Sequence, residues 1–301
     1  MTSKVRASIE LRGSRLRYAE VAEHGETFEL LNAGEVPLEF DIEEEVFSNQ
    51  VFLHREALRQ ILTQAFPDSS SPYLYVVLPP YHGMYFFSPQ DSRWTRTERE
   101  ESLLRDLGLL AGEDALGLLH VSVGTTQPVR ESYLGPVWYH VLAVPQQGFL
   151  RIEQATEDLV FARCQLFSSV QGAVMLGRRR IMQLPHGGED AWYLLIGQYK
   201  GQTELALGRG EAWVFAHDEP VDHPSDIVYY ALKVLERNRV NPRSLTQIWL
   251  YGEQVREEGL QPLTHITGCI PERLDPFAVV AAQEVKRKDF SAFVPCIGAA
   301  L

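Results

Sequence analysis

Along the first forty residues, apolar and polar positions alternate in a pattern typical of β-strands. The segments Val5–Leu11 and Leu16–Val21 both alternate, and the four residues Arg12-Gly13-Ser14-Arg15 between them suit a tight hairpin link. Phe28–Asn32 and Pro37–Ile42 are the third and fourth strands that the pattern predicts. We therefore expect the chain to begin with a β-hairpin and to continue as a sheet.

Helical spacing replaces this alternation at about His54–Phe66. The apolar residues of this segment, beginning with Leu53, recur at every third or fourth position, and a run rich in proline and serine then ends the helix. The next segment, Tyr73–Leu78, is apolar throughout, as expected of a strand that is covered on both faces. Two prolines end this strand, and Met84–Phe87 is predicted as another short strand.

A block at about Ser92–Val144 differs from the first sheet in its order of elements. Thr97 and Glu100 fit a capping box at a helix start, and two predicted strands, Leu116–Val123 and Val137–Val144, follow. We expect this helix–strand–strand block to be a small α+β insert rather than a continuation of the first sheet. After it the pattern predicts a helix near Gln146–Gln154, a strand at Leu159–Gln165 and a helix from Ser168 to about Arg180.

The second half of the chain repeats the style of the first half. It opens with three predicted strands, at Ala191–Gly197, Thr203–Leu207 and Glu211–Phe215. A helix that starts at Pro224, a buried strand at Gln247–Leu250 and a short closing helix at Ser291–Leu301 follow. The duplication predicts an α/β fold of two similar lobes that face a cleft. The first lobe would comprise residues 1–184, with the insert at about 92–144, and the second lobe residues 185–301.

Composition and charge narrow the function classes. The chain has 301 residues, with 28 Lys and Arg against 40 Asp and Glu, so its formal net charge is −12. This balance disfavours non-specific nucleic-acid binding and a broad basic face for anionic lipid. The start of the chain has no apolar signal segment, and no apolar run reaches the ~18 residues of a membrane helix. We therefore expect a cytoplasmic chain with no direct membrane insertion.

The cysteines fit the same compartment. Cys164, Cys269 and Cys296 are odd in number, far apart and in no CxxC pair. This spacing indicates a reducing environment rather than a disulfide framework or a cysteine zinc site.

Four segments carry a resemblance to a known superfold. They are Ser8–Val21 around the first hairpin turn, Leu195-Ile196-Gly197, Ile248–Glu253 after a buried strand, and Phe293–Leu301. In this order and spacing they resemble the motifs of the actin-like ATPases, a ribonuclease H-like fold with duplicated βββαβα lobes. The match is greatest with the bacterial pilus and secretion assembly branch: PilM of type IV pili, the cytoplasmic domain of GspL of type II secretion, and FtsA-like proteins. The resemblance covers nearly the full chain.

This resemblance implies where a nucleotide would lie. In the superfold, the first hairpin turn of each lobe holds a phosphate, because glycine lets backbone N–H groups approach phosphate oxygens closely. We expect no resident cofactor and no metal, and ATP with Mg²⁺ is the one candidate that the resemblance raises. The residues that would surround a nucleotide, if binding is retained, are Glu10, Arg12, Gly13, Ser14, Arg15, Gly197 and Gly252.

The chain departs from the family at the positions that carry the chemistry. The first-turn aspartate is Glu10, and the following glycine is Arg12, whose side chain would occupy phosphate space although its charge could bind phosphate. The second-turn aspartate is Leu195, which cannot hold a metal or orient water. The second glycine of the adenosine motif is Glu253, whose carboxylate disfavours an anionic ligand. Phosphoryl transfer depends on positioning and charge stabilisation, so we expect a degenerate member, a pseudo-ATPase with no catalytic residues. Gly13 and Gly197 can equally serve only as hairpin residues.

Other polar and aromatic clusters have a structural interpretation beside the functional one. His217, Asp218, Glu219, Asp222 and His223 could ligate a metal or form a solvated loop before a helix. The segment 186–190 is similarly either a ligand cluster or a turn. The basic run 178–180 could contact a phosphate or lie at a solvated helix end, and the acidic run 43–45 is expected to be solvated. The aromatic residues Tyr81, Tyr85, Phe86 and Phe87 could form a partner patch or pack in the core.

Three functions remain open at this stage. The first is a cytoplasmic actin-like scaffold, peripheral at the inner membrane, whose insert recruits a protein partner: the cytoplasmic tail of an inner-membrane assembly protein. The second is an active nucleotide-binding ATPase or small-molecule kinase on the same superfold. The third is a binding protein of unrelated function, since fold alone does not fix function. Homo-oligomerisation is compatible with each of them.

Overall fold

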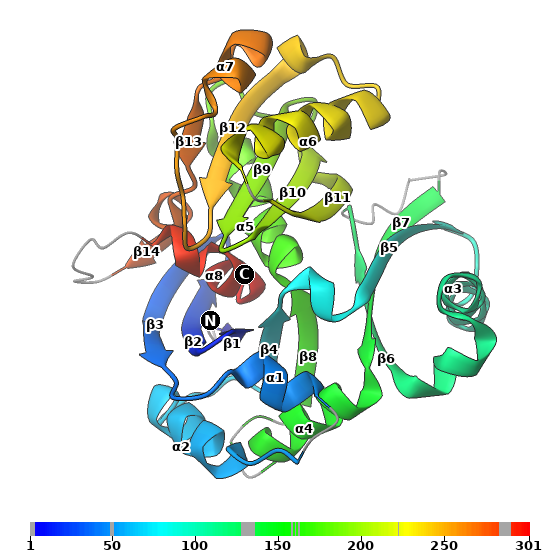
Figure 1. The fold of residues 1–301 in the computed structure, drawn as a ribbon, viewed down its shortest axis with the longest axis vertical. Coiled ribbons are helices and arrows are strands. Elements are labelled where there is room, and N and C mark those ends of the chain that lie inside the picture. The colour runs from blue at the N-terminus through cyan, green and yellow to red at the C-terminus, as the bar shows by residue number, and fades with distance from the viewer. Residues whose placement is uncertain are drawn as a thin grey trace.

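A computed structural model places three β-sheets and the helices around them (Figure 1). The structure describes residues 4–48, 51–127, 136–157, 159, 161, 163–221, 223–282 and 290–301. Two large sheets lie one above the other in Figure 1, and a smaller sheet projects to one side.

The first sheet has six strands in the order β14-β3-β2-β1-β4-β8. The strands are β1 (Lys4–Arg12), β2 (Arg15–His24), β3 (Thr27–Pro37), β4 (Tyr73–Leu78), β8 (Arg163–Ser168) and β14 (Val280–Ala282). The strands β1, β2 and β3 form an antiparallel meander, and β4 pairs with β1 in parallel. At the far edge β14, from late in the chain, pairs in parallel with β3.

The second sheet has five strands in the order β11-β10-β9-β12-β13. The strands are β9 (Trp192–Tyr199), β10 (Gln202–Arg209), β11 (Ala212–Pro220), β12 (Leu245–Tyr251) and β13 (Pro271–Arg273). Here too an antiparallel meander is followed by a strand that pairs in parallel with its first member. The order third-second-first-fourth is thus common to both large sheets.

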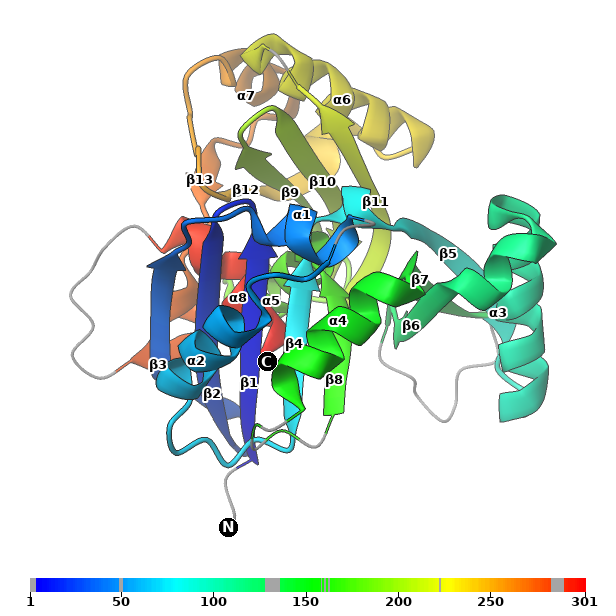
Figure 2. The same cartoon turned by 60° about the horizontal axis from the view of Figure 1, so that its bottom comes forward.

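The third sheet has the order β5-β7-β6 and carries the helix α3 at its side (Figure 2). Its elements are β5 (Met84–Asp91), α3 (Arg96–Ala111), β6 (Leu119–Thr125) and β7 (Pro136–Pro145). The strand β5 lies before residue 92, so the sheet takes in one strand outside the expected insert bounds. The bounds of the insert, and the division of the chain at residue 184, stay predictions.

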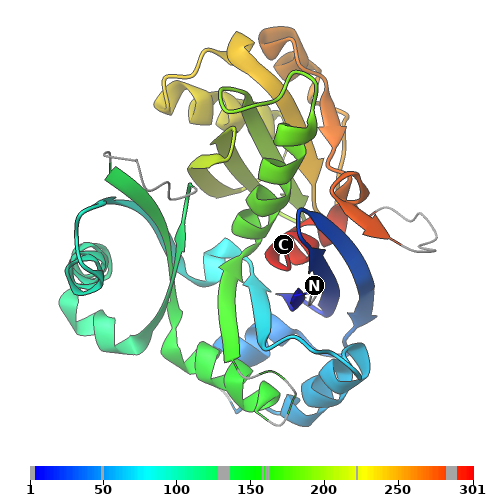
Figure 3. The same cartoon turned by 180° about the vertical axis from the view of Figure 1, so that it is seen from behind.

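The remaining helices pack on the sheets, and the buried apolar side chains between them form three clusters. These helices are α1 (Ile42–Phe47), α2 (Arg55–Ala65), α4 (Gln146–Thr156), α5 (Ser169–Gln183), α6 (Pro224–Arg237), α7 (Gln261–Thr267) and α8 (Val294–Ala299). The helices α1, α2 and α4 pack on one face of the first sheet. The helices α5 and α8 contribute to an apolar core shared with both large sheets (Figure 3), and α6 packs on the outer face of the second sheet. No helix within the described part of the chain is long and apolar enough to cross a bilayer.

The structure corrects the prediction of a fourth strand at Pro37–Ile42. The strand β3 runs to Pro37, and the chain then turns into α1. The Asp41 side chain accepts hydrogen bonds from the backbone N–H groups of Glu43 and Glu44, which is an N-cap arrangement that favours a helix over a strand.

Helix and strand ends are also shifted relative to the predictions. Thr95, rather than Thr97, caps α3, with Glu98 completing the capping box. Leu53 lies outside α2 and is 73% exposed, so it is not part of the apolar stripe of that helix. The strand expected at Leu159–Gln165 begins only at Arg163, and Val160 and Ala162 within that segment lie outside the described residues.

Candidate functional site

The turn of the first hairpin is formed by Gly13 and Ser14, as the sequence predicts. Gly13 has a φ of +54°, a left-handed conformation that favours glycine. The carbonyl oxygens of Gly13 and Ser14 accept hydrogen bonds of 2.9 Å from the backbone N–H groups of Ile42 and Leu38. The turn is therefore held against the start of α1 by its carbonyl groups.

Arg12 lies just before this turn and points away from solvent. Its Nη2 donates to Glu204 Oε1 at 2.7 Å and to Ser169 Oγ at 3.1 Å, and its Nε donates to Glu10 Oε1 at 3.2 Å. The guanidinium carbon lies 3.5 Å from the ring centroid of Tyr199, which is a cation–π arrangement. A residue at the tip of the first sheet thus binds directly to β10 of the second sheet.

Glu204 is the acceptor at the centre of this arrangement. It is 2% exposed and lies on β10, the second strand of the second hairpin. Besides Arg12, it accepts a hydrogen bond of 2.6 Å from Ser169 Oγ, and its Oε2 accepts one of 2.9 Å from the Tyr251 hydroxyl. Three donors from three different elements therefore satisfy this buried carboxylate.

Arg17 on β2 forms a second connection between the sheets. Its Nη2 donates to Glu253 Oε1 at 2.6 Å, just beyond β12, and its Nη1 donates to Glu10 Oε2 at 3.3 Å. Its Nε donates to Glu35 Oε2 at 2.7 Å within the first sheet. Glu10 thus lies between the two arginines. We refer to Glu10, Arg12, Arg17, Glu204 and Glu253 as the inter-sheet ion network.

Burial shapes the electrostatics of this network. Burial raises the pKa of the Glu10 carboxyl group, and the nearby Arg17 and Arg12 only partly oppose that shift. Burial would lower the pKa of Arg12, but Tyr199, Glu204 and Glu10 together hold it well above the usual value. The pKa of the Tyr251 hydroxyl is raised by burial and by Glu204. Arg12 therefore stays charged, and Tyr251 stays a hydrogen-bond donor to Glu204.

The second hairpin is packed tightly where the family has its second aspartate. Leu195 is fully buried in the core between the sheets, and a Cβ atom on Gly177 of α5 would lie 3.2 Å from its side chain. A Cβ atom on Gly197 would lie 2.6 Å from the ring of Tyr251. Gly197 is therefore required by the packing of an aromatic ring, whatever else it does.

Gly252 has a comparable structural reason. Its φ is +107°, and a Cβ atom there would lie 2.5 Å from the carbonyl oxygen of Gln198. Its backbone N–H donates to the carbonyl oxygen of Ser291 at 2.9 Å. The glycine at this motif allows β9, the loop after β12 and the segment before α8 to meet.

Of the residues that the resemblance places around a nucleotide, the structure brings Glu10 and Arg12 into direct contact. Ser14 and Arg15 are exposed, and Arg15 forms an ion pair of 3.1 Å with Glu35. Whether any of these residues binds a nucleotide stays a prediction.

Sequence reasoning missed six residues that contact Glu10, Arg12 or their partners: Arg17, Glu35, Ser169, Tyr199, Glu204 and Tyr251. One of them left a signal in the sequence. Glu204 is the one charged residue in the apolar segment 203–207, and an ionisable group at such a position needs a partner when buried.

A small cavity lies beside the second hairpin. It measures about 160 Å³, and its lining includes Gln198, Gly201, Thr203, Pro224 and Arg256. Sites for small molecules usually span ~300–1,000 Å³, so this cavity is too small for a nucleoside triphosphate in the arrangement seen here.

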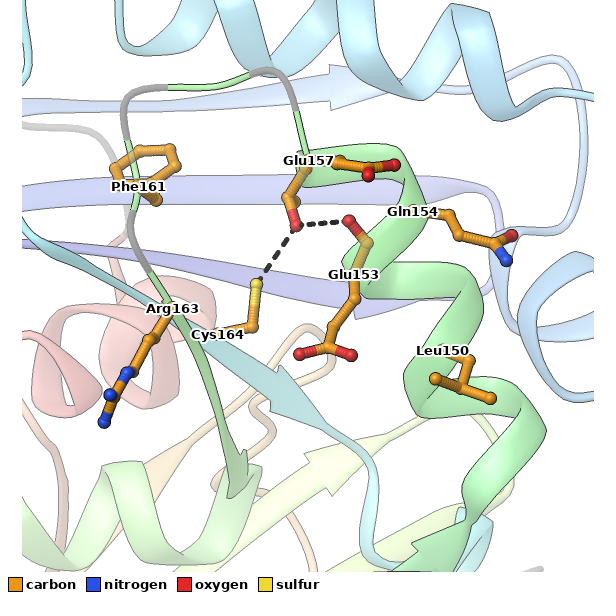
Figure 4. A pocket seen from close by; sticks show the side chains of 8 residues that line it. Leu150, Glu153, Gln154, Glu157, Phe161, Arg163 and Cys164 are labelled. Atoms are coloured by element: carbon orange, nitrogen blue, oxygen red, sulfur yellow. Dashed lines mark hydrogen bonds between the residues drawn. The ribbon is translucent and has the colours of Figure 1, made fainter.

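A larger cavity, of about 370 Å³, lies between α4 and the start of β8 (Figure 4). Glu153 and Glu157 line it on the side of α4, and Arg163 and Cys164 on the side of β8. The Cys164 thiol lies 3.2 Å from the Thr156 hydroxyl oxygen, and burial raises its pKa. Because the thiolate is the reactive form, this cysteine lacks the environment of a nucleophile.

The expected loop at 217–223 is largely strand. The strand β11 runs to Pro220, His217 lies 2.7 Å from Glu219, and Asp218 accepts a hydrogen bond of 2.8 Å from the Tyr85 hydroxyl. His223 is the N-cap of α6, and Asp222 lies outside the described residues. In the part of the chain that the structure describes, no group of three or more His, Cys, Asp or Glu side chains is placed to hold a metal ion.

The acidic run at 43–45 is not simply solvated, contrary to expectation. Glu43 accepts hydrogen bonds of 3.0 and 3.1 Å from the Tyr81 hydroxyl, and its carboxylate lies 3.0 Å from His82 Nε2. Burial alone would raise the pKa of Glu43. The hydrogen bonds and charge of His82 and Tyr81 lower it by more than burial raises it, so the net shift of the pKa is downward. Glu45 accepts hydrogen bonds from the backbone N–H of Leu53 and lies 2.9 Å from His54 Nδ1.

The basic run 178–180, the turn at His186 and the aromatic residues at 81–87 have contacts that are explained by packing or exposure. Arg178 is half-buried in α5 and Arg179 is exposed, with its guanidinium 5.2 Å from the ring of Phe28. His186 lies in an exposed turn. Of the aromatic residues, Phe87 packs edge-on against Trp213, and Tyr81 is 43% exposed.

Comparison with known proteins finds similarity in structure alone. No protein-family model matches the chain, and no curated protein matches it in sequence. A solved PilM-PilN type IV pilus biogenesis complex aligns with a TM-score of 0.69 at 15% identity, over 98% of this chain and 97% of the other. A Bacteroides thetaiotaomicron protein with an actin-like ATPase fold and unknown function aligns with a TM-score of 0.55 at 10% identity, over 91% and 93%.

The cytoplasmic domain of EpsL, an inner-membrane component of the type II secretion system of Vibrio cholerae, is also among the matches. It aligns with a TM-score of 0.47 at 10% identity, over 99% of this chain and 94% of the other. The first two alignments establish the fold alone: this chain has the actin-like ATPase fold that the resemblance implies.

Proposed function

We propose that this chain is an actin-like assembly scaffold that recruits a membrane-protein partner and does not hydrolyse ATP. The observation that carries the proposal is the position of Arg12. The first hairpin of the superfold holds a phosphate, whereas here the Arg12 guanidinium reaches across to Glu204 of the second hairpin.

A bound triphosphate would have to break this contact. Displacing Arg12 would leave Glu204 without its cationic partner and Glu10 with Arg17 alone, next to the negative charge of the phosphates. Leu195 adds no ligand for Mg²⁺ at the second hairpin, since its side chain is aliphatic and buried. Of the two aspartate positions of the family, one is thus Glu10, which is paired with Arg12 and Arg17, and the other is aliphatic, an arrangement that does not favour phosphoryl transfer.

The partner is proposed from the kind of complex that the fold resembles. The solved PilM structure is a complex with PilN, and EpsL is described as an inner-membrane component. By analogy we assign this chain to the cytoplasmic side of the inner membrane, held there by the cytoplasmic tail of an assembly protein. Self-association within such an assembly is compatible with this role.

The third sheet with α3 is the proposed recruiting surface. It exposes several large apolar side chains, which favour a protein contact. They are Leu104, Leu109, Leu110, Leu118 and Trp138. In addition, β5 and β6 are the edges of this sheet and suit pairing with an extended peptide.

Titration with Mg-ATP tests the nucleotide part of the proposal. We expect no saturable heat in isothermal titration and no increase in melting temperature at millimolar Mg-ATP, because ligand binding to the native state would raise it. Micromolar binding, or a melting temperature that rises with Mg-ATP concentration, would contradict the proposal.

Site-specific photo-crosslinking of the full chain in cells tests the partner. A photoreactive residue in place of Leu109 should form adducts with an inner-membrane assembly protein. The matched control places the same photoreactive residue at Lys233. This side chain is exposed on α6, the helix that packs on the outer face of the second sheet. Adducts at Lys233 alone, or at Leu109 only with proteins unrelated to the membrane, would refute the assignment.

A further inference from the structure

Two ion pairs join the large sheets at their hairpin ends. Arg12 of the first sheet pairs with Glu204 of the second at 2.7 Å, and Arg17 of the first pairs with Glu253 beyond β12 at 2.6 Å. Glu10 contacts both arginines and so connects the two pairs. The connection between the sheets at this point is ionic.

Away from the hairpin ends the contact between the sheets is of another kind. There the helices α5 and α8 lie between them and bury apolar side chains against both. The polar contacts of that layer centre on Cys296, whose carbonyl oxygen accepts a hydrogen bond of 2.7 Å from Ser8 Oγ and whose thiol lies 3.5 Å from the carbonyl oxygen of Ser8. Apolar packing tolerates small shifts because it is not directional, whereas hydrogen-bonded ion pairs have a narrow geometry.

The buried ion pairs therefore do more to fix geometry than to add stability. Replacing a buried ion pair by apolar residues is often neutral or stabilising, because charges lose their hydration on burial. A guanidinium held by Glu204, Ser169, Glu10 and the Tyr199 ring can take few other positions. Glu204 is likewise fixed by its three donors.

We propose that the inter-sheet ion network is a built-in clamp that holds the two large sheets closed at their hairpin ends without any ligand. This inference deepens the proposed function and rests on it in one respect, namely that no nucleotide bridges the hairpins. The clamp makes the closed arrangement the resting state of the free chain. Opening it requires that Arg12 and Arg17 regain hydration or find new anionic partners.

The distance between the two hairpin turns measures the clamp directly. Ser14 in the first turn and Lys200 in the second are both exposed. Spin labels attached to ketone-bearing residues at these two positions leave the native cysteines unchanged. Pulsed electron resonance on the full chain then gives the distribution of the distance between the labels. We expect one narrow distribution for the parent chain, unchanged by Mg-ATP.

Glu204→Gln keeps the shape of the acceptor and removes its charge. Its expected effect is a distribution at least twice as wide, with its mean shifted to longer distance. The matched control is Glu23→Gln, which breaks the 2.7 Å pair of Arg6 and Glu23 within the first sheet. That control should leave the distribution as in the parent. Equal distributions for Glu204→Gln and Glu23→Gln would overturn the clamp.

A second variant decides the question if Glu204→Gln does not fold. Glu253 is 21% exposed, so Glu253→Gln removes an inter-sheet pair at a less buried position. It should widen the distribution relative to Glu23→Gln, and no widening would refute the clamp. The two proposals fail separately: narrowing on addition of Mg-ATP to the parent contradicts the proposed function, whereas the comparison of variants tests the clamp.

Discussion

Gly172 of α5 and Gly298 of α8 lie against each other, so that neither has room for a side chain. A Cβ atom on Gly298 would overlap the carbonyl oxygen of Gly172, and one on Gly172 would overlap the carbonyl oxygen of Pro295. The two helices that separate the large sheets therefore approach each other backbone against backbone at these glycines.

This crossing predicts that Gly298→Ala destabilises the chain. The added methyl group must push the helices apart, and overpacking of this kind costs about 1–3 kcal/mol of unfolding free energy. Urea denaturation measures the change. Gly117→Ala is the matched control, because nothing lies within 4 Å of a Cβ atom at that position. Equal stability of the two variants would show that the helices can separate freely.

The pair Arg12–Glu204 predicts a strong energetic coupling. Arg12→Met leaves the buried Glu204 carboxylate without its cation, and removal of one partner of a buried pair costs about 3–5 kcal/mol. The double variant Arg12→Met/Glu204→Gln should cost less than the sum of its single variants by about 2 kcal/mol.

A double-mutant cycle with the corresponding substitutions at Arg6 and Glu23 provides the control for the coupling between Arg12 and Glu204. This pair is 17% and 30% exposed, and such pairs contribute below about 1 kcal/mol. Urea denaturation of both sets of variants gives the two coupling energies. Strictly additive effects at Arg12 and Glu204 would mean that the two charges do not stabilise each other.

Restoring the family aspartate should not restore nucleotide binding. Leu195 is fully buried, so Leu195→Asp places an unpaired carboxylate in the core and is expected to cost more than about 4 kcal/mol of stability. Leu195→Met conserves volume and should cost below about 1.5 kcal/mol. Urea denaturation and Mg-ATP titration follow the two variants. A folded Leu195→Asp variant that binds Mg-ATP would refute this expectation.

His140 predicts a loss of stability in acid. It is buried among aromatic rings, and neither ring nitrogen has a hydrogen-bond partner. Burial lowers its pKa from 6.5 to about 3. Between these values the unfolded chain binds a proton that the folded chain does not, so the stability contributed above pH 6.5 is lost as the pH falls toward 3.

The size of this effect follows from the pKa difference. At pH 5 the loss at His140 is about 2 kcal/mol relative to pH 7. His140→Phe removes the titration and keeps a ring in place. The unfolding free energy of the parent relative to this variant should therefore fall by about 2 kcal/mol from pH 7 to pH 5. A constant difference would show that His140 titrates normally in the folded state.

The duplicated arrangement was predictable from local patterns, because each half of the chain opens with short strand-like segments that are separated by polar or glycine-containing links. The strand at Tyr73–Leu78 was predicted to the residue from its apolar run. Helix starts were less predictable. Thr95 and Thr97 are each followed three positions later by a glutamate, so both fit a capping box by sequence, and the structure places the cap at Thr95.

The site was harder to predict, because its partners are distant in sequence. Arg12 could be recognised as an obstacle to phosphate, but its pairing with Glu204 spans 192 positions and depends on the way the two sheets meet. Likewise the expectation that Glu43 is solvated failed because Tyr81 and His82 reach it from another segment. Long-range side-chain pairing leaves little trace in local composition.

The pairing of β14 with β3 has a consequence for how the chain folds. Val280 aligns with Phe28, so the edge of the first sheet is completed by residues some 250 positions downstream. Contacts of such sequence separation carry a large loop-closure entropy and slow the formation of the sheet. Until they form, β3 presents an open edge on which other chains can add strands. We therefore expect a fragment that ends before β14 to aggregate. The yield of soluble protein should depend on the presence of the segment that supplies this last strand.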